Sequence, residues 1–403
     1  MPRKAKPPRP HGDDLRGASR LVVDATKRVT DVVQEMHVTI ASGPSLLGRP
    51  LEAPARALTG LVYGSIRGVT TAVGAGIDAV LARLGPVLGG SIPGPERAAV
   101  LAALNGVVGD YLHETGNPLA IEMCACQGGE LLDLEGASPG GTLRAATGKV
   151  LVLAHGCAMN DRQWARAGHD HGAALARDLG YTPVYLRYNS GLHISTNGRS
   201  FAELLERLLE VWPVPVEGLT ILGHSMGGLV ARSACHVGEA EGHAWRSKLE
   251  ALVCLGSPHH GSPLERGGNG IDLALGISRY SAPLARLGKL RSAGVTDLRH
   301  GSVLDEHWTG RDRFAHPGDP RAKLSLPEGV KCYVVAATLS PGPGKLRLGD
   351  GLVQVNSALG RHKRAELSLG IPEDRQWIGY GMGHLDLLAR ADVYERVRSW
   401  LAG

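Results

Sequence analysis

Aromatic residues are scarce in this sequence: they make up 4% of its 403 residues, and only two of them are phenylalanine. Alanine, valine and leucine must therefore fill most of any core. A stretch of about twenty uncharged apolar residues is also missing, so we expect no membrane-spanning helix. The formal net charge of +5 is mild for this length, and we expect no nucleic-acid partner.

The basic start of the chain, MPRKAKPPRP, is not followed by an apolar run. We therefore expect residues 1–17 to be a disordered tail rather than a secretory signal. The six cysteines are then expected to be reduced thiols in the cytoplasm. The C-x-C pair Cys124 and Cys126 and the His-Asp-His run at 169–171 suggest a metal or redox role, but buried small residues and a surface turn are the favoured interpretations. We accordingly expect no metal and no other cofactor.

Residues 18–114 are expected to form an N-terminal helical region. Apolar side chains recur every three or four residues over 18–40, which predicts a first helix. Glycine or alanine then recurs every fourth residue, which predicts a second helical stretch. A third helix is predicted from about Pro95 to Leu112. Glycines cost about 1 kcal/mol each in an exposed helix, so close packing must offset them. We favour a helical hairpin within 18–84 that packs on the rest of the chain or on a second subunit of a homo-oligomer. Peripheral docking on a membrane or granule surface is the alternative.

After residue 114 the pattern changes to short apolar runs separated by glycine-rich turns and amphipathic stretches. This alternation predicts an α/β fold with a doubly wound, mostly parallel sheet over residues 115–403. Ligands bind such sheets outside the carboxyl ends of the strands. The predicted strands are Lys149–Ala154, Thr182–Tyr188, Leu219–Gly223, Leu249–Leu255 and Val330–Ala337.

The stretch GHSMGG around Ser225 follows one predicted strand and opens a helical run. The pattern G-x-S-x-G alone is weak evidence, because 56 residues of the chain are glycine. Its place between a strand and a helix is what a nucleophilic serine requires, since a tight turn there exposes the hydroxyl above the sheet. The following helix N-terminus also favours developing negative charge. We therefore predict that Ser225 is a nucleophile.

A serine hydroxyl needs a base and an orienting acid, which follow it in the order acid, then histidine, in such a fold. His384 in GYGMGHLDLL lies in a glycine-framed loop before a C-terminal helix and is favoured over His362, which lies in a basic run. Asp350 in LGDGLV suits a carboxylate on a turn at the sheet edge. Asp272 and Asp386 are the alternatives; the first lies in an insertion and the second is expected to brace the chain locally.

An acyl-transfer site also needs donors for an oxyanion. The backbone N–H of Met226, directly after the nucleophile, is the first candidate. The second is the N–H of Cys157, because the loop after the strand at 149–154 turns sharply at His155 and Gly156. We interpret the Cys157 thiol as a packing group rather than a nucleophile.

These residues together resemble the lipase and esterase branch of the α/β-hydrolase superfamily, which includes bacterial triacylglycerol lipases and inositol-deacylase-like hydrolases. The resemblance covers about residues 149–402 and implies a triad of Ser225, Asp350 and His384. Residues 1–110 have no counterpart in it. The motifs that carry it are His155-Gly156, Tyr188-Asn189-Ser190-Gly191, GHSMGG, GSPHHGSP at 256–263, DGLV at 350–353 followed by Ser357-Ala358, and GHLDLL at 383–388.

A long insertion over about residues 262–325 separates two of the predicted strands, and its stretch 271–287 has an apolar helical pattern. In related hydrolases insertions at this place form a lid over the active site; an ordinary packed excursion is the alternative. As substrate-binding residues we assign His155, Gly156, His224, His259 and His260. For His259 and His260, which lie at the end of a predicted strand, a structural role is the alternative.

The function expected from these residues is hydrolysis of carboxylic esters of apolar acyl groups through an acyl-enzyme. The partner is then a small-molecule or lipid ester. An acyltransferase, a thioesterase or a depolymerase of intracellular polyester would keep the same triad. A non-catalytic protein that docks on a lipid surface or a partner through its N-terminal helices is the alternative of another class.

Overall fold

The computed structural model describes residues 95–135, 143, 146–262, 292–311, 319, 321–343 and 349–403. The expected tail at 1–17, the predicted helices within 18–84, and the apolar stretch 271–287 of the expected lid lie outside these residues. The chain divides into two compact units. Of the described residues, 98–114 and those from 120 onward belong to the first unit, and 95–97 and 115–119 belong to the second.

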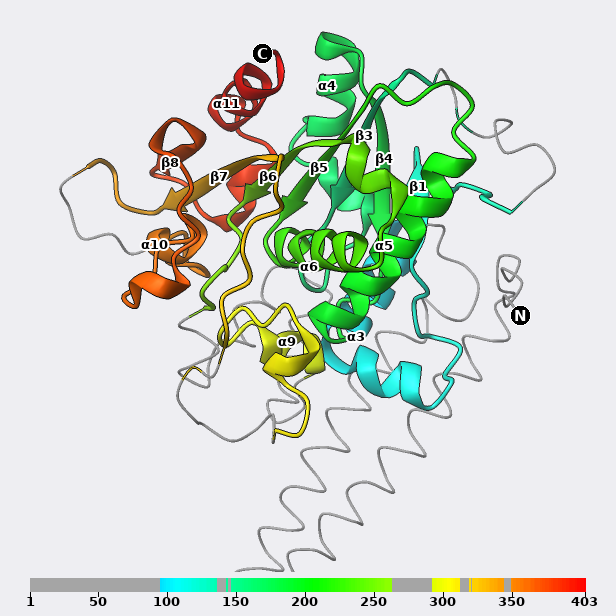
Figure 1. Cartoon of the computed structure of the whole chain (residues 1–403), viewed down its shortest axis with the longest axis horizontal. Coiled ribbons are helices and arrows are strands. Elements are labelled where there is room, and N and C mark those ends of the chain that lie inside the picture. The colour runs from blue at the N-terminus through cyan, green and yellow to red at the C-terminus, as the bar shows by residue number, and fades with distance from the viewer. Residues whose placement is uncertain are drawn as a thin grey trace, which may run out of the picture. The chain divides into compact units, whose positions relative to one another are not determined.

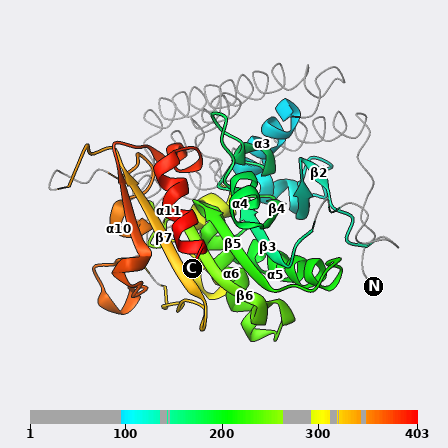
Figure 2. The same ribbon diagram turned by 90° about the horizontal axis from the view of Figure 1, so that it is seen from above.

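The first unit is built on an eight-stranded sheet with the order β2-β1-β4-β3-β5-β6-β7-β8. The six strands from β4 to β8 are parallel, whereas β1 is antiparallel to both β2 and β4. Figure 2 shows the strands side by side from β7 through β6, β5 and β3 to β4. The strands are β1 Cys124–Gln127, β2 Glu130–Leu131, β3 Lys149–Ala154, β4 Thr182–Arg187, β5 Gly218–His224, β6 Leu249–Leu255, β7 Lys331–Thr338 and β8 Gln376–Tyr380.

Helices connect the parallel strands, as an all-parallel arrangement requires. None of the helices in the described ranges combines the length and apolar character that a bilayer-spanning segment needs. The α-helices are α3 Pro95–Glu114, α4 His171–Leu179, α5 Ile194–Glu210, α6 Met226–Ala240, α9 Ala293–Asp297, α10 Val355–Ala358 and α11 Ala391–Leu401, and the 3-10 helices are η1 Asp161–Trp164, η2 Ala244–Lys248, η4 Asp305–His307, η5 Ala365–Leu367, η6 Glu373–Arg375 and η7 His384–Leu388.

The sheet separates two apolar layers, which explains why its central strands are apolar on both faces. On one face, alternate residues of β3, β5, β6 and β7 pack against α4 and α11, with Trp164 and Leu175 completely buried among them. Helices α5 and α6 pack on each other and cover the opposite face (Figure 1). The predicted α/β fold with a doubly wound, mostly parallel sheet is confirmed.

The five predicted strands match β3 to β7 to within one residue at each end. The sequence prediction lacked β1, β2 and β8. Both residues of β2 are exposed, and β8 is half-buried over most of its length, so neither presents the apolar run that marks a buried strand.

Helix α3 is tied to the sheet unit by polar contacts as well as by packing. The Asn189 side chain donates to the Gly109 carbonyl at 2.8 Å, and the Ser292 hydroxyl donates to the Gly106 carbonyl at 2.7 Å. The buried Asp110 accepts from the backbone N–H of Ala293 at 2.9 Å. Residues 98–114 belong to the same compact unit as the sheet, and the expected end of the N-terminal region at residue 114 stays a prediction.

A buried ion pair holds the chain segment that leaves β3. Arg187, the last residue of β4, donates to both carboxylate oxygens of Asp161 at 2.6 and 3.0 Å, and the Asp161 side chain is 1% exposed. Asp161 begins η1, directly after the loop that turns away from β3. The ion pair therefore fixes this loop to the neighbouring strand.

We predict that Asp161→Asn lowers the free energy of unfolding by about 3 kcal/mol, because it leaves the Arg187 guanidinium without its buried counter-charge. Urea denaturation monitored by circular dichroism measures the change. The control is Glu395→Gln, which breaks an exposed pair with Arg398 and should change the stability much less. Equal effects of the two substitutions would contradict the prediction.

Candidate active site

Ser225 lies at the junction of β5 and α6 with a backbone conformation that non-glycine residues rarely adopt. Its φ is 54° and its ψ is −122°, and its N–H donates to the Leu255 carbonyl at 2.8 Å. Such a conformation is strained and persists only where the surroundings hold it. Here the end of β6 supplies that hold. The strain supports the sequence-based hypothesis that Ser225 occupies a nucleophile turn.

The two glycines that flank the serine are required by close backbone contacts. A Cβ on Gly223 would lie 2.5 Å from the Gly228 nitrogen, and a Cβ on Gly227 would lie 2.1 Å from the Ala154 carbonyl oxygen. Neither contact can be relieved by a side-chain rotation, because both partners are backbone atoms. The first turn of α6 is thus pressed against the end of β3.

His384 and Asp350 form a buried pair beside this turn. His384 Nδ1 lies 2.7 Å from Asp350 Oδ2, and the two side chains are 4% and 0% exposed. Asp350 Oδ1 accepts from the N–H groups of Leu352 and Val353 at 2.9 and 2.7 Å. With both oxygens occupied, Asp350 holds the imidazole so that Nδ1 carries its proton, and Nε2 is left as the nitrogen that can accept another.

The other candidate acid and base residues have different surroundings. Asp386 Oδ2 accepts from the Gly383 N–H at 2.7 Å, the local bracing that the sequence suggested. His362 lies beside His260, with 4.9 Å between ring centroids, and its backbone N–H donates to Ser368. Asp272 lies outside the described residues.

His224 connects the nucleophile turn to the histidine loop. This residue directly precedes Ser225, is completely buried, and its Nε2 lies 3.2 Å from the His384 carbonyl oxygen. Because a carbonyl only accepts, Nε2 must carry the proton. Burial and the neighbouring His384 hold the pKa of His224 well below its usual range, which keeps it neutral. We expected His224 to bind substrate; the structure places its side chain beneath His384.

His384 also has a close neighbour at the end of β6. A Cβ on Gly256 would lie 3.1 Å from His384 Cε1. The Nε2 atom of His384 is buried and has no hydrogen-bond partner among the described residues. A buried acceptor without a partner suits a base that waits for the proton of a reacting group.

The candidate oxyanion loop follows β3 and reaches the serine. A Cβ on Gly156 would lie 3.1 Å from Ser225 Cβ, so this glycine is in contact range of the nucleophile. Ala158 has a φ of 58° and donates its N–H to the Ser190 hydroxyl at 2.9 Å. Cys157, which lies between these two residues, is buried.

The Met226 N–H lies at the first position of α6, where backbone N–H groups have no acceptor within the helix. Gly227 packs on Ala154 and His155, which lead into the loop that contains Cys157. The arrangement is that of two backbone segments flanking a candidate nucleophile, which is what an oxyanion hole requires.

His155 holds this loop in place through contacts with Tyr188 and Gly156. Its ring stacks on Tyr188 with 4.2 Å between centroids, its Nδ1 donates to the Gly156 carbonyl at 2.8 Å, and its own carbonyl accepts from the Tyr188 hydroxyl at 2.7 Å. Burial lowers the pKa of His155 to about 4, so the ring is neutral at physiological pH. The side chain is completely buried, and it shapes the loop.

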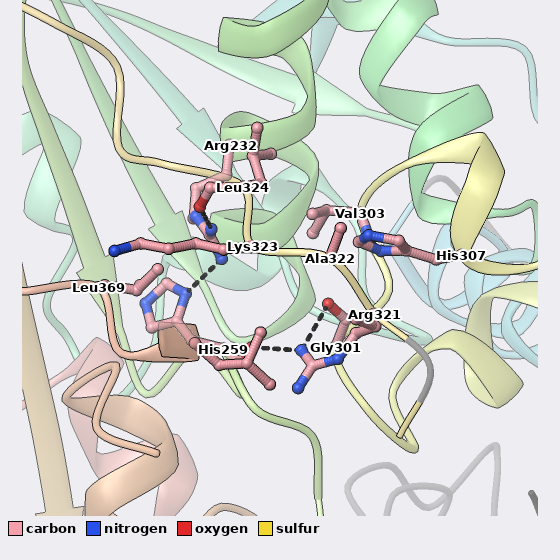
Figure 3. A pocket seen from close by; sticks show the side chains of 11 residues that line it. Arg232, His259, Gly301, Val303, His307, Arg321, Ala322, Lys323, Leu324 and Leu369 are labelled. Atoms are coloured by element: carbon pink, nitrogen blue, oxygen red, sulfur yellow. Dashed lines mark hydrogen bonds between the residues drawn. The ribbon is translucent and has the colours of Figure 1, made fainter. Parts of the chain in front are cut away.

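His259 and His260 follow Ser257 in the loop after β6. The His259 ring faces Arg232 of α6, with 3.4 Å between Nδ1 and Nη1. The His260 backbone N–H donates to the Ser357 hydroxyl at 3.1 Å, and its ring approaches His362. The structure therefore gathers Ser225, Gly156 and His384 around one turn, and it directs His259 to a separate pocket (Figure 3).

Sequence reasoning assigned no role to several residues that support the site. Tyr188 and Ser190 hold the candidate oxyanion loop, and Gly106 of α3 backs it, since a Cβ there would lie 2.7 Å from Ala158 Cβ. The motif Tyr188-Asn189-Ser190-Gly191 was noticed for its resemblance only. Its position at the end of a strand next to β3 was the signal that could have identified the role.

Among the described residues, no group of three or more His, Cys, Asp or Glu side chains is arranged to hold a metal ion. All six cysteines are free thiols. The run at 169–171 forms a hydrogen-bonded chain: His169 Nε2 lies 2.9 Å from His171 Nδ1, and His171 Nε2 lies 2.9 Å from the Leu387 carbonyl of η7. Burial lowers the pKa of His171 to about 4.

A strained serine between a parallel strand and a helix, followed in the chain by a hydrogen-bonded aspartate and histidine, defines the α/β-hydrolase class. The strand order and helix layers agree with that class. Within it, residues 145–321 match the family described as PGAP1-like alpha/beta domain. This match includes Ser225 and ends before Asp350 and His384. None of the curated proteins matches the chain in sequence.

Solved structures of lipases and esterases are similar at low identity. A lipase of Bacillus licheniformis in its mature form has 17% identity and a TM-score of 0.42, over 70% of this chain and 97% of that chain. A metagenomic carboxyl esterase has 15% identity and a TM-score of 0.39, over 79% and 98%. An esterase of Pyrobaculum calidifontis has 13% identity and a TM-score of 0.39, over 64% and 76%.

We predict that stability falls between pH 6.5 and 4, because His155 and His171 are buried as neutral rings. Their pKa values of about 4 in the folded protein lie below the value of 6.5 in the unfolded chain, so the unfolded state binds more protons in this window. Stability is therefore highest above pH 6.5 and is lost as the pH falls toward 4. At pH 5.5 each histidine should cost about 1.4 kcal/mol relative to pH 7.5.

Urea denaturation at the two pH values measures this loss. His155→Asn keeps a donor for the Gly156 carbonyl but removes the titrating ring, and should reduce the loss by about 1 kcal/mol. Tyr188→Phe is the control, since it loses a hydrogen bond to the same loop but leaves the histidine in place. A loss that is unchanged in His155→Asn would refute the assignment.

Proposed function

We propose that the protein is a serine hydrolase that cleaves carboxylic esters through an acyl-enzyme. The observation that carries the proposal is the buried hydrogen bond between His384 and Asp350 beside the strained Ser225 turn. An ordinary glycine-rich turn needs neither a strained serine nor a neighbouring imidazole with an unpartnered buried nitrogen. The combination is what activates a hydroxyl that is otherwise a poor nucleophile.

The proposal assigns the following roles. His384 Nε2 accepts the Ser225 proton as the hydroxyl attacks the ester carbonyl, and later returns it to the leaving alcohol. Asp350 keeps the imidazole in the required tautomer and stabilises the imidazolium that forms. The N–H groups of Met226 and Cys157 bind the oxyanion of the tetrahedral intermediate. Water then attacks the acyl-enzyme by the same route and releases the acid.

His224 acts in this scheme through position rather than contact with substrate. Its bond to the His384 carbonyl ties the base to the strand that presents the nucleophile. A displacement of about 1 Å between a nucleophile and its base lowers the rate about a hundredfold, so such a tie has catalytic value.

The direct experiment is labelling of the full-length protein by a fluorophosphonate probe, together with hydrolysis of p-nitrophenyl esters of increasing chain length. The wild type should be labelled and should hydrolyse at least one ester, whereas Ser225→Ala should lose both properties. A protein that only docks on a partner or a lipid surface need not react with the probe. Equal hydrolysis by wild type and Ser225→Ala would exclude the proposal.

A second prediction separates Asp350 from its rival. Asp350→Asn should lower kcat by about 10³ to 10⁴-fold, because the amide favours the wrong imidazole tautomer. Asp386→Asn retains an oxygen that can accept from Gly383 and should change kcat by less than about tenfold. Steady-state kinetics on the same ester measure both. A larger loss in Asp386→Asn than in Asp350→Asn would reverse the assignment of the acid.

A further inference from the structure

A polar pocket is lined by Arg232 of α6, by His259 of the loop after β6 and by the segment 321–324 (Figure 3). The empty space at this site is about 260 Å³, a figure that includes solvent at its opening. Three of its lining residues are cationic and none is acidic. The lining residues are Arg232, His259, Gly301, Val303, His307, Arg321, Ala322, Lys323, Leu324, Leu367 and Leu369.

Arg232 is a buried cation without a carboxylate partner. Its residue is 4% exposed, and among the described residues no Asp or Glu forms an ion pair with it. Its Nη2 donates to the Leu324 carbonyl at 2.9 Å, whereas its Nε is buried and has no partner. Burial lowers the pKa of Arg232 to about 10, so it still carries its charge at neutral pH. A buried charge without a counter-charge is costly, and this cost favours an anionic ligand.

His259 adds an unpartnered donor. A guanidinium can only donate, so the contact between Arg232 Nη1 and His259 Nδ1 makes Nδ1 the acceptor. The neutral ring then carries its proton on Nε2, which is buried and has no partner. Burial and the Arg232 charge hold the pKa of His259 well below its usual range, so the ring is neutral.

Arg321 frames the pocket and is already satisfied. Its Nε and Nη2 donate to the two Asp319 oxygens at 2.8 Å each, and its Nη1 donates to the carbonyls of His259 and Gly301 at 3.0 and 3.3 Å. Asp319 therefore neutralises Arg321 and has no bond to Arg232. The exposed Lys323 adds positive charge at the opening.

His307 on the opposite wall has the same proton arrangement as His259. The Val303 N–H donates to its Nδ1 at 3.2 Å, so the proton of the neutral ring lies on Nε2, near the Ala322 backbone. The His307 donor is thus directed at Ala322, whereas the His259 Nε2–H lies together with positive charge in the walls of this pocket. A ligand with several acceptor oxygens and negative charge is complementary to such walls.

We propose that this pocket binds a phosphate group, held by the Arg232 guanidinium and the His259 Nε2–H, with Lys323 at its opening. The phosphate belongs either to a free phosphate ion or to the anionic head of a larger molecule. Arg232 follows Ser225 by seven residues on α6, so the two sites are about 10 Å apart along the helix. The site is distinct from the proposed esterase centre and does not depend on it.

The test is isothermal titration calorimetry of the full-length protein with inorganic phosphate, at fixed ionic strength. The wild type should show saturable one-to-one binding, and Arg232→Met should bind at least about tenfold more weakly. Arg199→Gln is the matched control, because Arg199 is an exposed arginine that pairs with Glu241, and it should bind as the wild type does. Absence of saturable binding by the wild type, or equal affinities of wild type and Arg232→Met, would overturn the proposal.

A second variant, His259→Asn, tests the site if Arg232→Met does not fold. In His259→Asn the amide oxygen replaces Nδ1 as the acceptor for Arg232, while the Nε2–H donor is lost. Its affinity for phosphate should fall about tenfold or more if this donor contacts the ligand. Thermal unfolding should show that phosphate raises the Tm of the wild type more than that of His259→Asn. Equal Tm shifts would contradict the site.

The source of the phosphate is decided by competition. If the pocket holds the head of an ester substrate, inorganic phosphate should raise KM for an ester that carries a phosphate group and leave KM for a neutral ester unchanged. If it holds free phosphate, calorimetric binding should persist with no selective effect on either KM. Both results support the site, and loss of calorimetric binding overturns it whether or not the esterase is active.

Discussion

The candidate site depends on the contact between the first turn of α6 and the end of β3. Gly227 lies against the Ala154 carbonyl, so the helix begins close to the neighbouring strand, and Ser225 at its start has a positive φ. The β6 carbonyl of Leu255 secures that conformation through the serine N–H. Close packing around this turn thus holds the half-buried, strained serine on which the proposed chemistry depends.

Around this turn, hydrogen bonds satisfy the buried polar side chains and also fix their orientation. Asp350 is saturated by two backbone N–H groups and one imidazole, so its charge is satisfied and His384 is oriented at the same time. Asp161 and Arg187 do the same for the loop after β3. In each case a polar group that would destabilise a core in isolation fixes one loop of the site. The scaffold and the candidate site therefore share the same interactions.

The sequence was sufficient for elements whose burial is complete. Strands β3, β5, β6 and β7 are buried along nearly their whole length and were predicted almost to the residue. Ser225, Asp350 and His384 were selected from glycine-framed loops and from the chain order expected in such a fold. Edge strands such as β2 carry no such signal because they are exposed. The position of His224 beneath His384 and of His259 beside Arg232 depends on contacts between segments far apart in the chain. Periodicity and local motifs contain no information about those contacts.

The start and the middle of α6 are linked by electrostatics as well as by the backbone. If Arg232 keeps its charge about 10 Å from Ser225, an effective dielectric constant of about 20 gives about 1.7 kcal/mol of attraction for a negative charge at the nucleophile. That is close to a factor of twenty in an equilibrium. An anion bound at Arg232 would offset this attraction. A buried cation without a protein counter-charge is costly to the fold, yet at this distance it favours the oxyanion that the proposed reaction must form. The same charge can thus be unfavourable for folding and favourable for catalysis, with its effect set by whether the pocket is occupied.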